Sequence, residues 1–149
     1  MEKCRIEQNL TGDFTEYLRV WEASVRATHD FLKEEDIGLY KEIINKTALP
    51  GIEHLYSATL SGNTMVGFLG VQGHHIEMLF IHPSERGKGI GKQLILFAIE
   101  ELHINSVDVN EQNTQALGFY QKMGFRITGR DDLDGQGKPY PILHMKLVR

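Results

Sequence analysis

The spacing of apolar residues predicts alternating helices and strands along the chain. Apolar side chains recur at intervals of three and four over residues 14–25, which is typical of an amphipathic helix. Further helices are expected at 34–48, at 90–103 and directly after Asn113, a residue that favours the first position of a helix. The Pro-Gly pair that follows the second helix is expected to end it.

Short apolar or alternating runs predict strands between these helices. The expected strands lie at 5–8, 54–60, 64–71, 75–81, 106–109, 125–128 and 142–148. The resulting order is β-α-α-β-β-β-α-β-α-β-β, with no internal repeat or linker. This order predicts an α/β fold in one domain, residues 1–149, with a mixed, twisted sheet of about seven strands and about four helices packed on it.

Composition narrows the class of protein. The chain has 149 residues, enough for one core, and 16 Lys plus Arg against 20 Asp plus Glu disfavour binding to nucleic acid or an anionic membrane. A single cysteine, Cys4, cannot form an internal disulfide, and no apolar run is long enough to span a bilayer. We therefore expect a cytoplasmic protein that acts on small molecules or specific proteins.

The strongest local signal is the segment Arg86–Lys92, which lies between a predicted strand and a predicted helix. Its three glycines allow tight turns and close approach to a ligand, and the positive end of the helix favours an anion. Lys88 and Lys92 add positive charge. A nucleoside triphosphate loop requires Ser or Thr after its lysine, and this chain has Gln93; the glycine spacing of a dinucleotide site also fails.

Two motifs resemble those of the GNAT acetyltransferase superfamily. In the segment 79–91, Arg86, Gly89 and Gly91 occupy the places of the family's Arg/Gln-x-x-Gly-x-Gly/Ala core. The segment 113–125 resembles the family's Asn-x-x-Ala-x-x-Phe-Tyr-x-x-x-Gly-Phe signature, at the expected distance. Two matches are much more specific than one. The segments 29–31 and 137–141 further resemble the small bacterial YjaB-type branch.

The resemblance implies acetyl-CoA as cosubstrate and a sheet that splits between its fourth and fifth strands to admit it. The implied cofactor-binding residues are Leu79, Phe80, Ile81, Arg86, Gly87, Lys88, Gly89, Ile90, Gly91, Lys92 and Asn113. Backbone groups of the first three would pair with the pantetheine arm, and the loop amides would hold the pyrophosphate. In this family the amine attacks the thioester directly in a ternary complex, so neither a cysteine nucleophile nor a metal is required.

Tyr120 is the candidate general acid. In the family, a tyrosine at this place protonates the departing coenzyme A thiolate, and Asn113 would contact the cofactor. A helical tyrosine more often serves packing, and Asn113 also fits a simple helix cap; capping and cofactor contact are compatible.

The acceptor amine must lose a proton before it attacks, because an ordinary lysine amine has a pKa near 10.4. Strand alternation predicts that His75, Glu77, Leu79 and Ile81 share one face. Glu77 is our first candidate for the general base and His75 the alternate. Asp108 is a third candidate, and a water chain would need none of them.

The acceptor is left open by the sequence. The first helix offers Trp21, Arg26 and His29 as candidate contacts, although Trp21 also fits the apolar stripe. A protein or peptide amine and a small amine both remain, and the YjaB-type resemblance favours the former. The alternative function is a non-catalytic acyl-CoA sensor module. We expect no metal site, and a monomer or homodimer.

Overall fold

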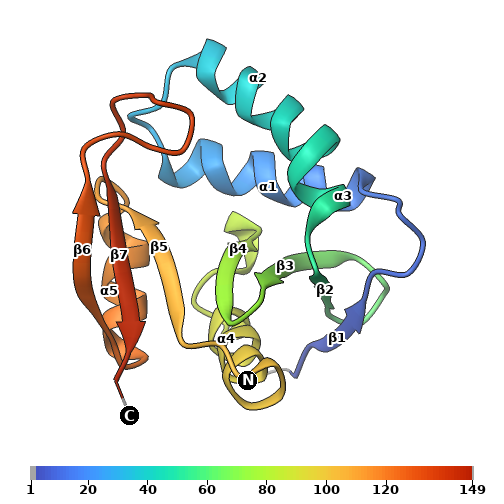
Figure 1. The fold of residues 1–149 in the computed structure, drawn as a ribbon. Coiled ribbons are helices and arrows are strands. Elements are labelled where there is room, and N and C mark those ends of the chain that lie inside the picture. Colours follow the sequence, from blue (N-terminus) through green and yellow to red (C-terminus); the bar gives the residue numbers. More distant parts are fainter. Residues whose placement is uncertain (1–2, 149) are drawn as a thin grey trace.

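Seven strands form one mixed sheet in the computed structural model, which describes residues 3–148 (Figure 1). The strands are β1 Arg5–Gln8, β2 His54–Thr59, β3 Met65–Gln72, β4 His75–Ile81, β5 Ser106–Asn110, β6 Phe125–Asp131 and β7 Ile142–Leu147. Their order across the sheet is β1-β2-β3-β4-β5-β7-β6, and the neighbours are antiparallel except for β4 and β5. The predicted fold class is confirmed.

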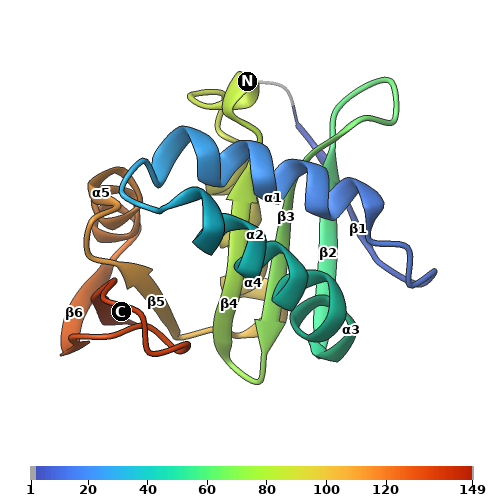
Figure 2. The same cartoon turned by 90° about the horizontal axis from the view of Figure 1, so that it is seen from above.

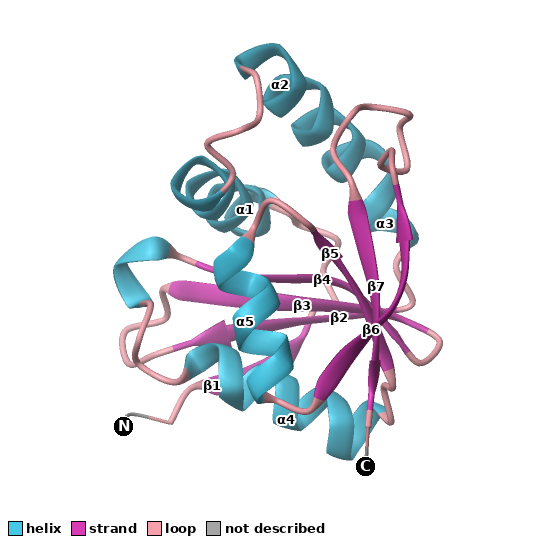
Figure 3. Cartoon of the chain, turned by 90° about the vertical axis from the view of Figure 1, so that its left-hand side faces the viewer, coloured by secondary structure: helices cyan, strands magenta, loops and turns pink. Residues whose placement is uncertain are grey.

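Helices cover both faces of this sheet (Figures 2 and 3). They are α1 Thr15–Thr28, α2 Glu34–Ile43, the π-helical turn Ile44–Ala48, α3 Leu49–Gly51, the 3-10 turn Pro83–Glu85, α4 Ile90–Leu102 and α5 Thr114–Lys122. The segments α1 to α3 lie on one face and α4 and α5 on the other. The helical segment predicted at 34–48 continues to Gly51 through the π-helical turn and α3, so Pro50 lies within its last turn instead of ending it.

The two faces bury separate apolar clusters. On the α4 face, Leu94 and Val71 are fully buried, and on the α1 face, Val20 and Phe68 are fully buried. From Phe68 to Val71, alternate side chains of the central strand β3 enter the two clusters, as the period of two in a strand requires. Before Phe68, a register shift between β2 and β3 interrupts this alternation and leaves Val66 in the α4-face cluster. The buried strands hold β4, from which the loop before α4 starts, in a fixed position.

The sheet splits between β4 and β5, as the resemblance implies. Only two residue pairs, His75 with Ser106 and Ile76 with Val107, connect the two strands. Beyond them the strands part, while β4 stays paired with β3 on its other side. The split leaves the β5-facing edge of β4 without a strand partner over its second half.

A β-bulge in β4 makes one sequence prediction wrong. The β3–β4 register shifts at Gly70, so that Glu77 has no paired residue in β3 and the alternation is interrupted there. The odd-numbered residues of His75–Ile81 therefore do not share a face. Leu79 and Ile81 pack on the cluster of the α4 face, whereas His75 and Glu77 lie on the opposite face. The extra residue in the bulge shifts the alternation of side chains by one position.

Candidate active site

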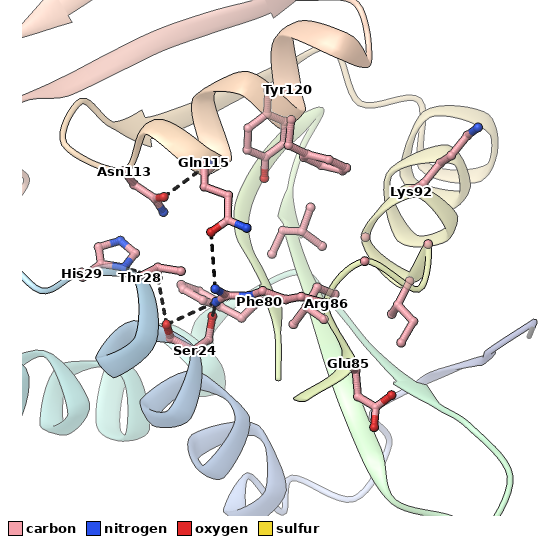
Figure 4. Close-up of a pocket in the computed structure, with 18 residues that line it drawn as sticks. Ser24, Thr28, His29, Phe80, Glu85, Arg86, Lys92, Asn113, Gln115 and Tyr120 are labelled. Atoms are coloured by element: carbon pink, nitrogen blue, oxygen red, sulfur yellow. Dashed lines mark hydrogen bonds between the residues drawn. The ribbon is translucent and has the colours of Figure 1, made fainter. Parts of the chain in front are cut away.

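A cavity of about 370 Å³ opens where β4, the glycine-rich loop, α1 and α5 meet (Figure 4). This volume lies within the usual range for small-molecule sites. Ten of the eleven predicted cofactor-binding residues line it, from both sequence motifs. The exception is Lys88, whose exposed ammonium pairs with Glu85 at 2.9 Å. Segments far apart in the sequence thus converge on one cavity.

The glycine-rich loop has the geometry of an anion site. Gly87 and Gly89 have φ values of 77° and 81°, in the left-handed region that favours glycine. Gly89 is also the N-cap of α4, so the loop turns directly into the first helical turn. The first N–H groups of a helix have no partner within the helix and carry its positive dipole. The cavity therefore borders a group of donors suited to a phosphate.

Arg86 lies across the cavity between two helices (Figure 4). Its Nη2 is 3.3 Å from Ser24 Oγ in α1, and its Nη1 is 3.5 Å from Gln115 Oε1 in α5. Partial burial lowers the pKa of the Arg86 guanidinium, because desolvation disfavours the cation. An anion entering the cavity would compensate this desolvated charge.

Asn113 and Tyr120 come from the two ends of α5. The Asn113 side chain caps the helix by accepting the Ala116 amide at 3.2 Å, as predicted, and it also borders the cavity. The Tyr120 ring packs edge-on against Phe119 and Phe125, and its side chain is 6% exposed. Figure 4 shows its hydroxyl directed into the cavity.

Burial also determines the protonation of Tyr120. Desolvation raises the pKa of its phenol above the ordinary value of 10, so the hydroxyl keeps its proton at neutral pH. A protonated hydroxyl at the wall of a cavity is able to act as a proton donor.

The α1 side of the cavity was largely missed by the sequence analysis. Ser24, Thr28 and His29 line it, and of these only His29 was a candidate contact. The hydroxyls of Ser24 and Thr28 were the available signal. These residues are four apart and place two polar groups on the apolar side of an amphipathic helix. Trp21 is buried in the α1 cluster, and Arg26 pairs with Glu22 and Glu34 on the surface.

His29 is held as a neutral side chain. Its Nδ1 is 2.8 Å from Thr28 Oγ1. Burial, followed by the nearby charge of Arg86, lowers the pKa of His29 to about 4. The imidazole therefore adds no positive charge to the cavity at neutral pH.

The three candidate bases lie outside this cavity. His75 Nδ1 is 2.7 Å from Ser106 Oγ, and His75 Nε2 is 3.5 Å from Asp108, which also bonds His144 at 2.7 Å. Glu77 borders a second cavity of about 520 Å³ on the α2 face of β4. Phe80 lines both cavities. The assignment of the general base stays a prediction.

Two negative findings concern the described part of the chain. Within residues 3–148, no group of three or more His, Cys, Asp or Glu side chains is arranged to hold a metal ion, and no helix is long and apolar enough to cross a membrane. Cys4 does not line the cavity. It is 6% exposed and bonds Gln93, and burial raises the pKa of its thiol, which opposes the formation of a nucleophilic thiolate.

Known proteins resemble this chain in both sequence and fold. Residues 27–148 match the model of the acetyltransferase (GNAT) domain. The peptidyl-lysine N-acetyltransferase YjaB of Salmonella typhimurium is 44% identical over 128 residues, which are 86% of this chain and 87% of that protein. The solution structure of apo YjaB from Escherichia coli superimposes with a TM-score of 0.87 at 37% identity, over 97% of each chain. The PaiA N-acetyltransferase of Thermoplasma acidophilum, solved with coenzyme A, shares the fold with a TM-score of 0.74 at 21% identity, over 99% of each chain.

Proposed function

This chain belongs to the GNAT acetyltransferase family and is an N-acetyltransferase, and on that premise we propose that it transfers the acetyl group of acetyl-CoA to a lysine side chain of a protein or peptide. The observation that carries the proposal is the single cavity that joins an anion-binding loop to a buried tyrosine hydroxyl. The acceptor class is supported by the 44% identity with a peptidyl-lysine N-acetyltransferase.

The cavity suits the two chemically different parts of acetyl-CoA. The pyrophosphate matches the left-handed loop at Gly87 and Gly89, the first turn of α4 and the Arg86 cation. The pantetheine arm carries amides, which match the backbone of Leu79–Ile81 where β4 has lost its β5 partner. The 3-10 turn Pro83–Glu85 connects the end of β4 to the loop, and both segments line the same cavity.

Side chains of the protein donate and accept the protons of the reaction. Bound acetyl-CoA supplies an activated thioester. Tyr120 stays protonated and donates its proton to the departing sulfur, while Asn113 holds the start of α5 in place. The acceptor amine loses a proton and then attacks the thioester without a covalent enzyme intermediate. We propose that Glu77 accepts this proton, with His75 as the alternate base.

The compartment and the domain organisation are also part of the proposal. We infer a cytoplasmic protein acting as one acetyltransferase domain, residues 1–149, since the single cysteine is a free, buried thiol and strands from both ends of the described chain share one sheet. Either a monomer or a homodimer fits this proposal.

The alternative function, a non-catalytic acyl-CoA sensor, would need the loop but not a tyrosine hydroxyl directed into the cavity.

Release of free coenzyme A thiol tests the proposal. We expect release from acetyl-CoA with lysine-containing peptides, and mass spectrometry should find the acetyl group on the lysine side chain. Matched peptides with norleucine in place of lysine are the control. Tight binding of acetyl-CoA without thiol release for any peptide or small amine would support the sensor instead. Release with small amines alone would exclude the peptide acceptor.

A further inference from the structure

The second cavity lies on the face of β4 opposite α4, beneath the helical segment that runs from α2 to α3. Its apolar walls come from Ile44, Ala48, Ile52, Met78 and Phe80. Among the described residues that line it, Glu77 is the only one with an ionisable side chain. Because Phe80 also lines the first cavity, the two cavities share a side chain of β4, on the strand next to the split.

The π-helical turn Ile44–Ala48 shapes this cavity. The Leu49 amide bonds to the Ile44 carbonyl, five residues earlier, instead of four as in an α-helix. Pro50 follows; it has no amide proton, and its ring would crowd a carbonyl four residues earlier, which favours a wider turn. Leu49 enters the core at 2% exposure, whereas Thr47 stays exposed at the cavity. Such turns occur frequently at functional sites.

The β-bulge brings a charge to the same cavity. Because Glu77 is the extra residue of β4, its side chain lies on the α2 face beside Met78. The carboxylate is exposed, and within residues 3–148 it makes no ion pair. The cavity therefore combines an apolar wall with one carboxylate that no cation of the described chain neutralises.

An alkyl chain that ends in an ammonium group complements these walls. Its methylenes would bury apolar surface, and the ammonium would lie against the carboxylate. We propose that the second cavity is the acceptor site, in which the π-helical turn contacts the aliphatic stem of a lysine side chain and Glu77 binds its ammonium. The turn then selects long, unbranched primary amines. This inference rests on the proposed function, because it names where that acceptor binds.

Binding can be measured apart from catalysis. The probe is Nα-acetyl-lysine methylamide, titrated into isotope-labelled protein that holds coenzyme A, and the norleucine analogue keeps the stem but lacks the ammonium. We expect the amide signals of Thr47 and Ala48 to shift with the lysine probe, and the norleucine analogue to bind about tenfold more weakly or worse. In Glu77→Gln, the two probes should bind alike.

A substitution in the turn tests specificity. Thr47→Phe should fill the cavity and raise the KM for a lysine peptide about tenfold or more, with the affinity for acetyl-CoA unchanged. Folding should survive, since Thr47 is exposed. Asn45→Phe is the matched control, because Asn45 is exposed in the same turn and does not line the cavity. Asn45→Phe should leave both the KM for the lysine peptide and the affinity for acetyl-CoA as in the parent protein.

Several outcomes would overturn the inference. An unchanged KM in Thr47→Phe, equal binding of both probes to the parent protein, or signal shifts confined to β5 and β7 would each place the acceptor elsewhere. If the parent protein acetylates no peptide, the proposed function fails, and the lysine and norleucine probes alone decide whether the cavity binds an alkylammonium group.

Discussion

The ring and the hydroxyl of Tyr120 have different surroundings, so one substitution separates packing from proton transfer. Tyr120→Phe keeps the edge-on contacts with Phe119 and Phe125. We expect turnover to fall by about 10²- to 10⁴-fold, the usual scale of general acid catalysis. Steady-state kinetics with a lysine peptide measures this loss.

The affinity for acetyl-CoA and the melting temperature serve as controls for Tyr120→Phe, and both should stay close to the parent values. Full activity of the variant across neutral pH would mean that Tyr120 only packs and that the thiolate leaves unassisted or takes its proton from solvent.

His29 makes stability depend on pH. Its pKa is about 4 in the folded protein against about 6.5 unfolded, so the unfolded chain binds the proton more readily. The folded protein favours the neutral form of His29. Its contribution to the free energy of unfolding is therefore complete above about pH 6.5 and is lost as the pH falls towards 4. Between pH 7.5 and pH 5, we expect this group to reduce the free energy of unfolding by about 2 kcal/mol.

Urea unfolding of the parent and of His29→Gln at both pH values checks this expectation, because other titrating groups act in both proteins and cancel in the comparison. The variant should lose less stability on acidification. Equal losses in the two proteins would show that His29 is not held neutral by burial and by Arg86.

At the scale of elements, the loop before α4 can be tested against a glycine with similar backbone strain. Gly87 and Gly12 have φ values of 77° and 74°, and a Cβ at either position would meet no atom within 4 Å. Only Gly87 lines the cavity. Valine at either position should destabilise the fold by a similar amount, roughly 1–2 kcal/mol, because both would hold a side chain in the left-handed region.

We therefore expect Gly87→Val to weaken acetyl-CoA binding by about tenfold or more and Gly12→Val to leave it unchanged. Calorimetric titration of both folded variants measures the difference. If the two variants bind acetyl-CoA equally well, the loop is an ordinary turn before a helix rather than a phosphate site.

At the scale of the whole molecule, a ligand in the first cavity would connect α1, β4, α4 and α5. Acetyl-CoA at 100 times its Kd should stabilise the folded state by about 2.7 kcal/mol, since the unfolded chain has no such cavity. For a chain of this length, that free energy corresponds to a rise in Tm of roughly 5–10 °C.

Differential scanning calorimetry with acetyl-CoA, ATP and NAD distinguishes the ligands. The two nucleotides lack the pantetheine arm and should shift the Tm much less. A larger rise with ATP or NAD than with acetyl-CoA would contradict the assignment of the first cavity.

The sequence alone predicted the strands, the main helices and most of the residues that line the first cavity. The strand at His75–Ile81 was predicted with its observed bounds, because periodicity and turn residues are local properties. The glycine-rich loop and the motif from Asn113 to Tyr120 named most of the residues that line the cavity. Local spacing carries this information, since a helix N-terminus and its glycines act over a few residues.

Only the tertiary structure decided which face each residue occupies and which segments meet. The bulge at Glu77 depends on the register between β3 and β4, and strict alternation therefore gave the wrong face. The residues Ser24 and Thr28 border the cavity because α1 packs against β3 and β4, and β4 is the strand next to the split. The second cavity combines a π-helical turn with a bulged strand. These features arise from contacts between segments distant in sequence, whose geometry is fixed only when both cores pack.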